Sequence, residues 1–543
     1  MHRFKKHGIG ALVVLGAAAV LAAVFVTGAL GEEGQDQPIE FTHNVRDAPA
    51  PVAGAVFGNG PPTTPGTPVC TTPTQLAPNV NTDCEMTTAG PGPHNETSIA
   101  INPTDQNNLI GGVNDYQLGI NPGGHVTETV QSRAHVTFDG GRTWSMYPVL
   151  SNSAYQATGD PALAFDAAGT AYYATLGFRF VGPVNALNPD ILVSTSTDKG
   201  RNWTVRRVAE GSGNFGSVGD LLDKEYIAAW GTGNAVVTFG DFRLGQKGAF
   251  ESAVIYSSIT HDGGNTWSKP QVISGADNQA FVSVPVHTAD GRVFVAYLNT
   301  ADLVTGRDDY RVVELSPATG ARIAGPFTVA QVIDGFKDYP IAFGRQTYQD
   351  SVFRSWAAGN ITSDPARAGH LAVVWSDMRN GAATDPDPYK TQTNSDVIVS
   401  QSFDYGRTWS SPVALALDGD QWMPWGAYDT GGKLRIGTFD RSGDPLNHTY
   451  NYSLGTETAS GSLTFAVAPV TTVRSDPTRG NRWFAATLKP AFPFATSFIG
   501  DYSNIAVFPN GSGVASYWTD LRNDATFGTR TGHGQDAYFA KTP

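Results

Sequence analysis

The stretch Thr137-Phe138-Asp139-Gly140-Gly141-Arg142-Thr143-Trp144-Ser145 contains a pattern that the chain repeats. The pattern is a hydroxyl residue, any residue, Asp, any residue, Gly, any residue, Thr or Asn, and Trp. It returns at residues 196–203, 260–268 and 402–410. Four copies of one motif indicate an architecture built from repeated units.

Each residue of the motif suits a tight turn between two strands. The Asp can accept hydrogen bonds from N–H groups of the turn, and the Gly can adopt the positive φ that a sharp reversal needs. The Trp carries a large apolar surface to the start of the next strand. Extended apolar runs such as Ala134-His135-Val136 precede the copies. The motif therefore predicts a hairpin turn in a small antiparallel sheet.

The motif resembles the Asp box, or bacterial neuraminidase repeat, of sialidases and related β-propellers. This resemblance implies a propeller fold and identifies the fold more specifically than an activity. It assigns the motif residues a structural role as turn clamps, on the face opposite the expected binding face, and catalysis by them is the less favoured alternative. These residues are Asp139, Trp144, Asp198, Trp203, Asp262, Trp267, Asp404 and Trp409.

The spacing of the motif predicts the number of blades. The aspartates are separated by 59, 64 and 142 residues, and the last gap is about twice the others. A blade with a degenerate turn at residues 316–320 fits between the third and fourth copies, and two more units follow the fourth. We expect an all-β propeller of seven four-stranded blades. Six blades, as in sialidases, is the alternative.

The last predicted unit is one strand short. Propellers often complete the last blade with a strand from the other end of the chain, and residues 38–45 are our candidate. The globular propeller is expected at residues 94–543, after a Pro-, Gly- and Thr-rich spacer at residues 32–93.

Composition limits the location and the partners. The 543 residues are 16% charged with a net charge of −13, and no basic run follows the N-terminus, so nucleic acid is not the expected partner.

Residues 1–31 have a basic start and an apolar run, so they predict either a secretory signal peptide or an N-terminal membrane anchor. Both place the body outside the cytoplasm. Cys70 and Cys84 are the only cysteines, and in an exported chain they are expected to pair.

A second repeat ends the second strand of several units. It places Arg243, Arg379 and Arg522 two residues after an aspartate, and acidic residues open the inner strands. One interpretation is recognition of an acidic sugar by arginines with a carboxyl group as the acid. The other is a set of Asp–Arg pairs that lock the blades. The acidic residues are Glu96, Asp160, Asp223 and Asp501, with Asp350 and Asp420 as further candidates.

The resemblance to sialidases implies an arginine triad, a Tyr–Glu nucleophile pair and an Asp acid/base. We take Arg243, Arg379, Arg522, Asp501 and Tyr502 as candidate catalytic residues, with Tyr517 as another phenol. The Phe-Arg-Ile-Pro motif of sialidases is absent, so no motif fixes these assignments.

Two functional hypotheses follow, and no cofactor is required by either. The first is an exported, monomeric exo-sialidase-like glycoside hydrolase that acts on acidic glycans. The second is a non-catalytic propeller that binds glycan, a cell-surface polymer or protein. A loop with Asp385, Asp387 and Asp396 has the oxygen ligands that Ca²⁺ takes, although a solvated loop is the alternative.

Overall fold

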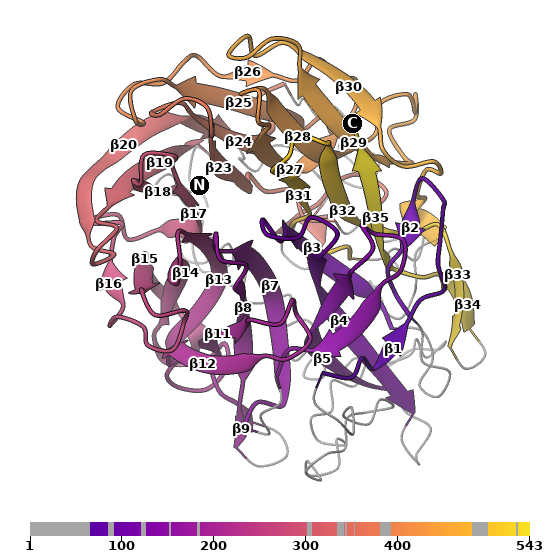
Figure 1. Cartoon of the computed structure of the whole chain (residues 1–543), viewed down its shortest axis with the longest axis horizontal. Coiled ribbons are helices and arrows are strands. Elements are labelled where there is room, and N and C mark those ends of the chain that lie inside the picture. The colour runs from indigo at the N-terminus through magenta and orange to yellow at the C-terminus, as the bar shows by residue number, and fades with distance from the viewer. Residues whose placement is uncertain are drawn as a thin grey trace, which may run out of the picture.

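The chain forms a ring of seven four-stranded antiparallel sheets, a seven-bladed β-propeller (Figure 1). The structure is a computed structural model that describes residues 66–84, 92–120, 126–150, 154–181, 185–300, 307–333, 341–342, 345–351, 353–380, 392–479, 498–527 and 530–543. Within these ranges it contains no α-helix, and its two short 3-10 turns are Gln246–Gly248 and Pro477–Arg479. The predicted fold class and the count of seven blades are confirmed.

Each blade runs from an inner strand at the ring axis to an outer strand at the rim. Blade 1 contains β3 (His94–Ile101), β4 (Leu109–Ile120), β5 (Val126–Thr137) and β6 (Ser145–Pro148); blade 2 contains β7 (Ala157–Phe165), β8 (Ala171–Phe178), β11 (Asp190–Ser196) and β12 (Thr204–Ala209); blade 3 contains β13 (Gly219–Trp230), β14 (Asn234–Leu244), β15 (Phe250–Thr260) and β16 (Gln271–Val272). Blade 4 contains β17 (Ala280–His287), β18 (Val293–Asn299), β19 (Arg307–Leu315) and β20 (Arg322–Ile333); blade 5 contains β23 (Gly359–Ser363), β24 (Leu371–Asp377), β25 (Asp396–Ser402) and β26 (Val413–Ala414); blade 6 contains β27 (Gln421–Tyr428), β28 (Leu434–Asp440), β29 (Asn451–Glu457) and β30 (Phe465–Pro469). Blade 7 contains β31 (Asn504–Val507), β32 (Val514–Asp520), β35 (Asp536–Thr542) and β2 (Val80–Asn81). Three two-stranded hairpins accompany the blades: β9–β10 (Phe180–Val181, Asn185–Ala186), β21–β22 (Ile341–Ala342, Arg345–Gln346) and β33–β34 (Asp524–Phe527, Arg530–His533).

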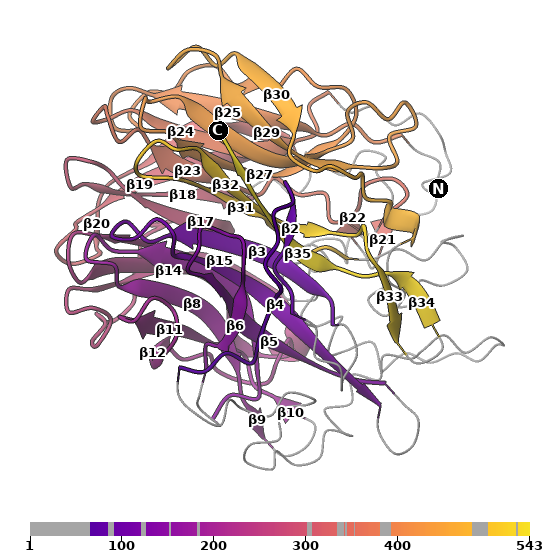
Figure 2. The same ribbon diagram turned by 45° about the vertical axis from the view of Figure 1, so that its right-hand side comes forward.

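The ring is closed by a strand from the N-terminal side, as predicted, but by a different segment. β2 pairs with β35 as the outer strand of blade 7, and the two lie side by side in Figures 1 and 2. β1 (Cys70–Thr71) adds a fifth strand to blade 1 beside β6. The candidate at residues 38–45 lies outside the described residues, and its proposed position is occupied by β2.

A disulfide secures the closing segment. Cys70 and Cys84 are bonded, with their Cα atoms 5.8 Å apart. The bridge links β1 on blade 1 to the residues that follow β2 on blade 7. It therefore spans the joint at which the two ends of the propeller meet.

The four Asp boxes form the turns between the third and fourth strands, and in each the Asp accepts hydrogen bonds from N–H groups of its turn. In blade 1, Asp139 Oδ1 accepts hydrogen bonds from the N–H groups of Arg142 and Thr143, at 3.0 Å each. The Trp144 indole N–H donates to the Gly141 carbonyl, also at 3.0 Å. Trp144 is fully buried and packs on Phe539 of blade 7. The motif thus clamps its own turn and contributes to packing between blades.

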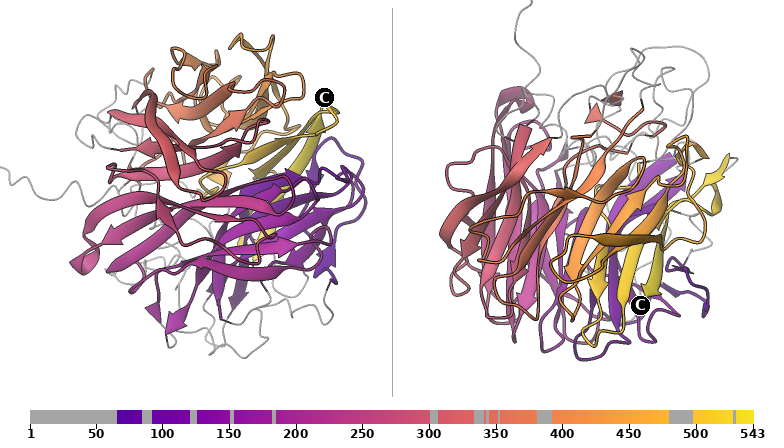
Figure 3. Two further views of the ribbon diagram at one scale, coloured as in Figure 1. Left: turned by 60° about the vertical axis from the view of Figure 1, so that its left-hand side comes forward. Right: turned by 90° about the horizontal axis from the view of Figure 1, so that it is seen from above.

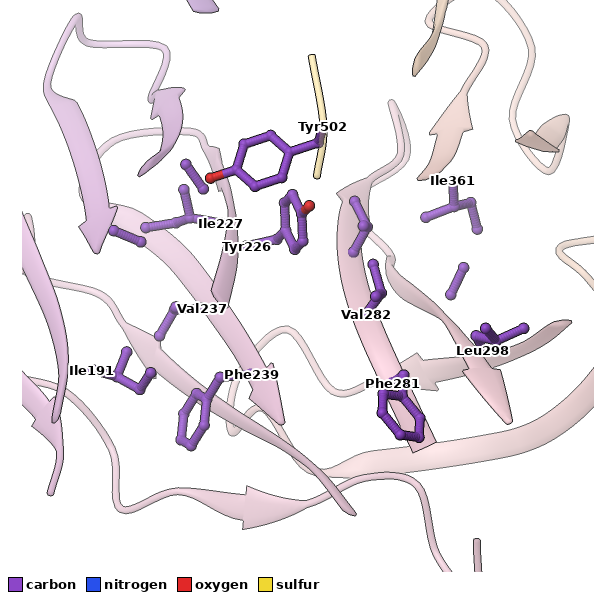
Figure 4. Packing of buried hydrophobic residues seen from close by; sticks show 14 of the residues in the cluster. Ile191, Tyr226, Ile227, Val237, Phe239, Phe281, Val282, Leu298, Ile361 and Tyr502 are labelled. Carbon is purple, nitrogen blue, oxygen red and sulfur yellow. The ribbon is translucent and has the colours of Figure 1, made fainter. Parts of the chain in front are cut away.

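The blades pack through apolar faces. Each inner strand contacts the inner strands of the two neighbouring blades around the whole ring. Figure 3 shows the sheets standing side by side around the ring, and Figure 4 shows Phe239 of blade 3 and Phe281 of blade 4 among the buried side chains between them. Burial of such side chains contributes about 1.5–3 kcal/mol each, so the interfaces between blades stabilise the ring.

The described residues contain no helix long and apolar enough to cross a bilayer. The predicted signal peptide or anchor at residues 1–31 lies outside those residues.

Candidate functional site at the hub of the propeller

A cluster of buried charges lies where the inner strands of blades 1, 2, 3 and 7 meet. Its centre is Lys224 of β13, whose Nζ is 2.7 Å from Asp160 Oδ2 and 2.8 Å from Asp501 Oδ2. Glu96 Oε1 lies 3.7 Å from the same nitrogen. All four side chains are no more than 3% exposed. We call this group, together with Asp223, Glu225 and Arg354, the hub cluster.

Irregular backbone in the inner strands carries these side chains. β3, β7 and β13 each shift register against the next strand at a bulge. At these bulges Glu96, Asp160 and Lys224 have φ values of 54°, 59° and 56°, in the left-handed region that is strained for residues other than glycine. Strands of blades 1, 2 and 3, with Asp501 just before β31 of blade 7, therefore bring the charges to one point.

The same bulge occurs elsewhere in the ring with different side chains. β17 and β27 also shift register, and Val282 and Met423 have positive φ there. The bulge is thus a general feature of this propeller and not in itself a mark of function. What distinguishes blades 1 to 3 is that the bulge carries a charge, which makes the hub chemically asymmetric.

Arg354 and Asn114 complete the ionic network. Arg354 Nη1 lies 3.0 Å from Asp501 Oδ2, so Asp501 contacts two cations. The Asn114 amide donates to Glu96 Oε2 at 2.8 Å, and its oxygen accepts from the Asp160 N–H at 2.9 Å. Gly500 lies so close to Glu96 that a Cβ on it would be 2.5 Å from Glu96 Cγ. A side chain at position 500 would displace Glu96.

Aromatic rings line one side of the hub cluster. Lys224 Nζ is 5.9 Å from the ring centres of both Trp356 and Tyr502, within the range of cation–π attraction. Tyr226 packs edge-to-face on Tyr502, as Figure 4 shows, with ring centres 5.7 Å apart. The Tyr502 hydroxyl donates to the Pro161 carbonyl at 3.0 Å.

Burial and mutual repulsion perturb the protonation of the cluster. Burial, with the charge of Asp160 next, raises the pKa of Glu96 well above its usual range. Burial also raises the pKa of Glu225 well above its usual range, and it raises that of Asp223 to about 7 although Lys224 opposes the shift. Burial lowers the pKa of Lys224, but the surrounding carboxylates outweigh it and hold that pKa well above the usual value. The hub therefore combines carboxyl groups that hold a proton near neutral pH with a permanent ammonium.

Several carboxyl oxygens of the cluster have no hydrogen-bond partner among the described residues. These are Asp160 Oδ1, Asp223 Oδ2 and both oxygens of Glu225. A buried pair in blade 6 differs, because Asp420 there accepts from Arg441, Ser395, Thr393 and Asn447. Buried polar atoms are almost always satisfied by protein, water or ligand. The hub thus has acceptor capacity that the described protein atoms leave unfilled.

The candidate residues predicted from the sequence separate into two groups. Asp501 and Tyr502 lie in or against the hub cluster. The three arginines lie at the ends of second strands in blades 3, 5 and 7, each bound by an aspartate of its own blade. The Arg243–Asp220, Arg379–Asp377 and Arg522–Asp520 nitrogen–oxygen distances are 2.8, 2.8 and 2.6 Å.

Other acidic candidates have local partners. Asp350 lies 3.1 Å from His448 Nδ1, and Asp420 pairs with Arg441. Asp396, one of the calcium candidates, accepts from the Asn380 amide at 2.7 Å. The other two candidates, Asp385 and Asp387, lie outside the described residues.

The sequence interpretation missed Lys224, Glu225 and Arg354. The run Asp223-Lys224-Glu225-Tyr226 could have indicated the first two, since three consecutive charges stand between apolar residues of one strand. No repeat marks Arg354, which comes from the segment that leads to β23.

Comparison with known proteins agrees with the resemblance to sialidases that the Asp boxes and the propeller fold indicate. No family model matches the chain. A curated sialidase from Micromonospora viridifaciens is 28% identical over 239 residues, covering 38% of this chain and 34% of that protein, so the chain spans about a third of its length. The Asp boxes, the ring of blades and this relative make the chain a sialidase-like β-propeller.

Solved structures resemble the chain only distantly. A Dyadobacter fermentans protein of unknown function has a TM-score of 0.40 and 12% identity, over 67% of this chain and 94% of that chain. The NanB sialidase of Streptococcus pneumoniae has a TM-score of 0.40 and 9% identity, over 80% and 83% of the two chains. An α-L-arabinofuranosidase from Fusarium graminearum has a TM-score of 0.37 and 11% identity, over 82% and 93%. These values are too low to support an argument about activity.

Proposed function

We propose that the chain is a glycan-acting propeller that hydrolyses a glycosidic bond at the hub cluster. The observation that carries the proposal is the combination at one point of proton-holding carboxyl groups, ion-paired carboxylates and unfilled acceptor atoms. Glycoside hydrolysis needs such a pair of differently protonated carboxyl groups. The similarity to a curated sialidase also supports glycoside hydrolysis.

The chemistry assigns different roles to the two kinds of carboxyl group. Asp223 or Glu225 donates a proton to the departing glycosidic oxygen. Asp160 or Asp501 faces the positive charge that develops on the sugar ring and takes the proton of the attacking water.

The specific form of the proposal is an exo-acting hydrolase of acidic, sialic-acid-like glycans. Its support is the relative's activity and the cation Arg354 at the hub. The three arginines of the second-strand repeat receive no role in gripping the substrate, because they lie at the ends of second strands and not in the hub cluster. An extracytoplasmic location agrees with the disulfide between Cys70 and Cys84.

Turnover of 4-methylumbelliferyl glycosides tests the proposal, with a sialic-acid glycoside and neutral hexosides and pentosides in one panel. We expect turnover of at least one glycoside by the wild type and a loss of about 10²–10⁴-fold in Asp501→Asn, as for removal of a group that acts in the reaction. Asp520→Asn, in the Asp–Arg pair of the same blade, is the control and retains activity. Undiminished turnover by Asp501→Asn would refute the hub as the reaction centre.

The depth of burial favours a second candidate, a non-catalytic propeller whose hub cluster only joins the inner strands. Asp501 is 0% exposed and Lys224 3% exposed. In that case the wild type turns over no glycoside of the panel, and Asp501→Asn changes stability alone.

A further inference from the structure

A second buried cluster lies at the joint where the ring closes. Among the described residues, Asp83, His94 and His135 form a group whose potential ligand atoms all lie within 4.8 Å of one another. Asp83 follows the closing strand β2, whereas His94 and His135 come from β3 and β5 of blade 1. All three side chains are buried.

The spacing of the atoms suits a metal ion. Asp83 Oδ2 is 3.1 Å from His94 Nδ1, and Asp83 Oδ1 is 3.4 Å from His135 Nδ1. Ligands bound at 2.0–2.1 Å in a tetrahedron stand about 3.3 Å apart. Two imidazoles and a carboxylate are ligands that Zn²⁺ accepts, with a fourth position for water.

The surroundings hold one imidazole in the orientation that a ligand needs. Asp115 Oδ1 lies 3.3 Å from His94 Nε2, on the side of the ring away from Asp83. Arg133 Nε donates to the other oxygen of Asp115 at 3.2 Å. A carboxylate behind a ligating histidine is the usual second contact of a metal site, because it fixes the tautomer and the ring plane.

Unfilled hydrogen-bonding capacity points to a missing partner. Asp83 Oδ1 and His94 Nδ1 are buried and make no hydrogen bond to described residues. A cluster built only as a network of hydrogen bonds would have satisfied these atoms. The hydroxyls of Thr82 and Tyr517 are hydrogen-bonded with His135 Nδ1, at 2.9 and 3.0 Å, and hold in place the nitrogen that faces Asp83.

We propose that Asp83, His94 and His135 bind a transition-metal ion of the Zn²⁺ class that fastens the closing segment of the ring to blade 1. Because Asp83 follows β2 of blade 7 while His94 and His135 belong to blade 1, the bound ion would oppose separation of β2 from blade 1. The site is distinct from the hub cluster and does not depend on the proposed hydrolysis. Its function is structural, and it supplements the disulfide at Cys84.

The test is metal content and metal-dependent stability of the full chain. The wild type, loaded with Zn²⁺ and then desalted, should retain about one equivalent by mass spectrometry of the metal, and a chelator should lower its Tm. Asp83→Asn and His135→Gln should both lose the bound zinc and the effect of the chelator on Tm. His370→Gln is the matched control, because His370 also sits fully buried beside an aspartate, with Nδ1 2.8 Å from Asp364 Oδ2.

Absorption spectroscopy of the wild type tests for the metal site even if the variants fail to fold. Co²⁺ added to the chelator-treated protein should give the intense visible absorption of a four-coordinate site, and Zn²⁺ should abolish it. Absence of both retained zinc and this absorption would overturn the proposal and leave a protonated His94 bridging Asp83 and Asp115. Retention of zinc by Asp83→Asn and His135→Gln would overturn it as well, by placing the ion elsewhere.

Discussion

Replacement of Lys224 by Met removes the cation that holds the hub together. The Lys224 ammonium contacts Asp160 at 2.7 Å, Asp501 at 2.8 Å and Glu96 at 3.7 Å, and it is 3% exposed. Removing one partner of a buried ionic group costs about 3–5 kcal/mol, because the remaining charges stay buried without compensation. We expect Lys224→Met to lower the free energy of unfolding by about this amount at pH 8.

The loss should depend on pH. Without the ammonium, the carboxyl groups bind protons in the folded state at pH values where they are ionised in the unfolded state. Stability of the variant then falls as pH rises, since the folded state binds more protons. The difference from the wild type should therefore be smaller at pH 5 than at pH 8.

Urea denaturation followed by tryptophan fluorescence at pH 5 and pH 8 measures both effects. Lys199→Met is the matched control, because Lys199 also has a positive φ, of 66°. It pairs with Asp105 at 2.6 Å, but the two side chains are 44% and 30% exposed, so its removal should cost about 0–1 kcal/mol. A loss for Lys224→Met as small as that of the control, and equal at both pH values, would refute the assigned ionic network.

Three further changes test other parts of the structure. Asp404→Ala removes the acceptor of two turn N–H groups in an Asp box, so it should destabilise the chain by about 1–2 kcal/mol. Thermal denaturation measures this loss, and the glycoside assay should show unchanged turnover. Joint replacement of Cys70 and Cys84 by Ser should cost about 3 kcal/mol and remove the effect of a reductant on Tm; a Tm equal to that of the oxidised wild type would contradict a stabilising bridge. Burial raises the pKa of Asp223 to about 7, so if Asp223 is the acid, kcat/KM should fall as pH rises through about 7, and the persistence of this fall in Asp223→Asn would assign it to another group.

Much of the fold could be predicted because the Asp box is a local signal. Its hydrogen bonds lie within a few residues of each other, as in Asp139 with Arg142 and Thr143. Regular spacing then predicted the blades that lack the motif. The closing strand was placed wrongly because β2 has only two residues and no alternating pattern; its position is determined by pairing with β35, far away in the sequence.

The candidate site was predictable in part. Acidic residues that open inner strands, such as Glu96, Asp160 and Asp501, could be recognised from the repeat, and the propeller topology brings inner strands together. The bulges that turn Glu96 and Asp160 towards one lysine leave no pattern in the sequence. Arg354 was not predictable for a related reason, since its contact with Asp501 joins residues 147 positions apart.

Hydrolysis at the hub cluster requires that a sugar occupies it. A crystal structure of Asp501→Asn soaked with the glycoside that the wild type turns over fastest tests it most directly. We expect a sugar ring against Lys224 and the carboxyl groups of Asp160 and Asp223. A sugar bound only at another place on the propeller, with no sugar at the hub cluster, would contradict hydrolysis there.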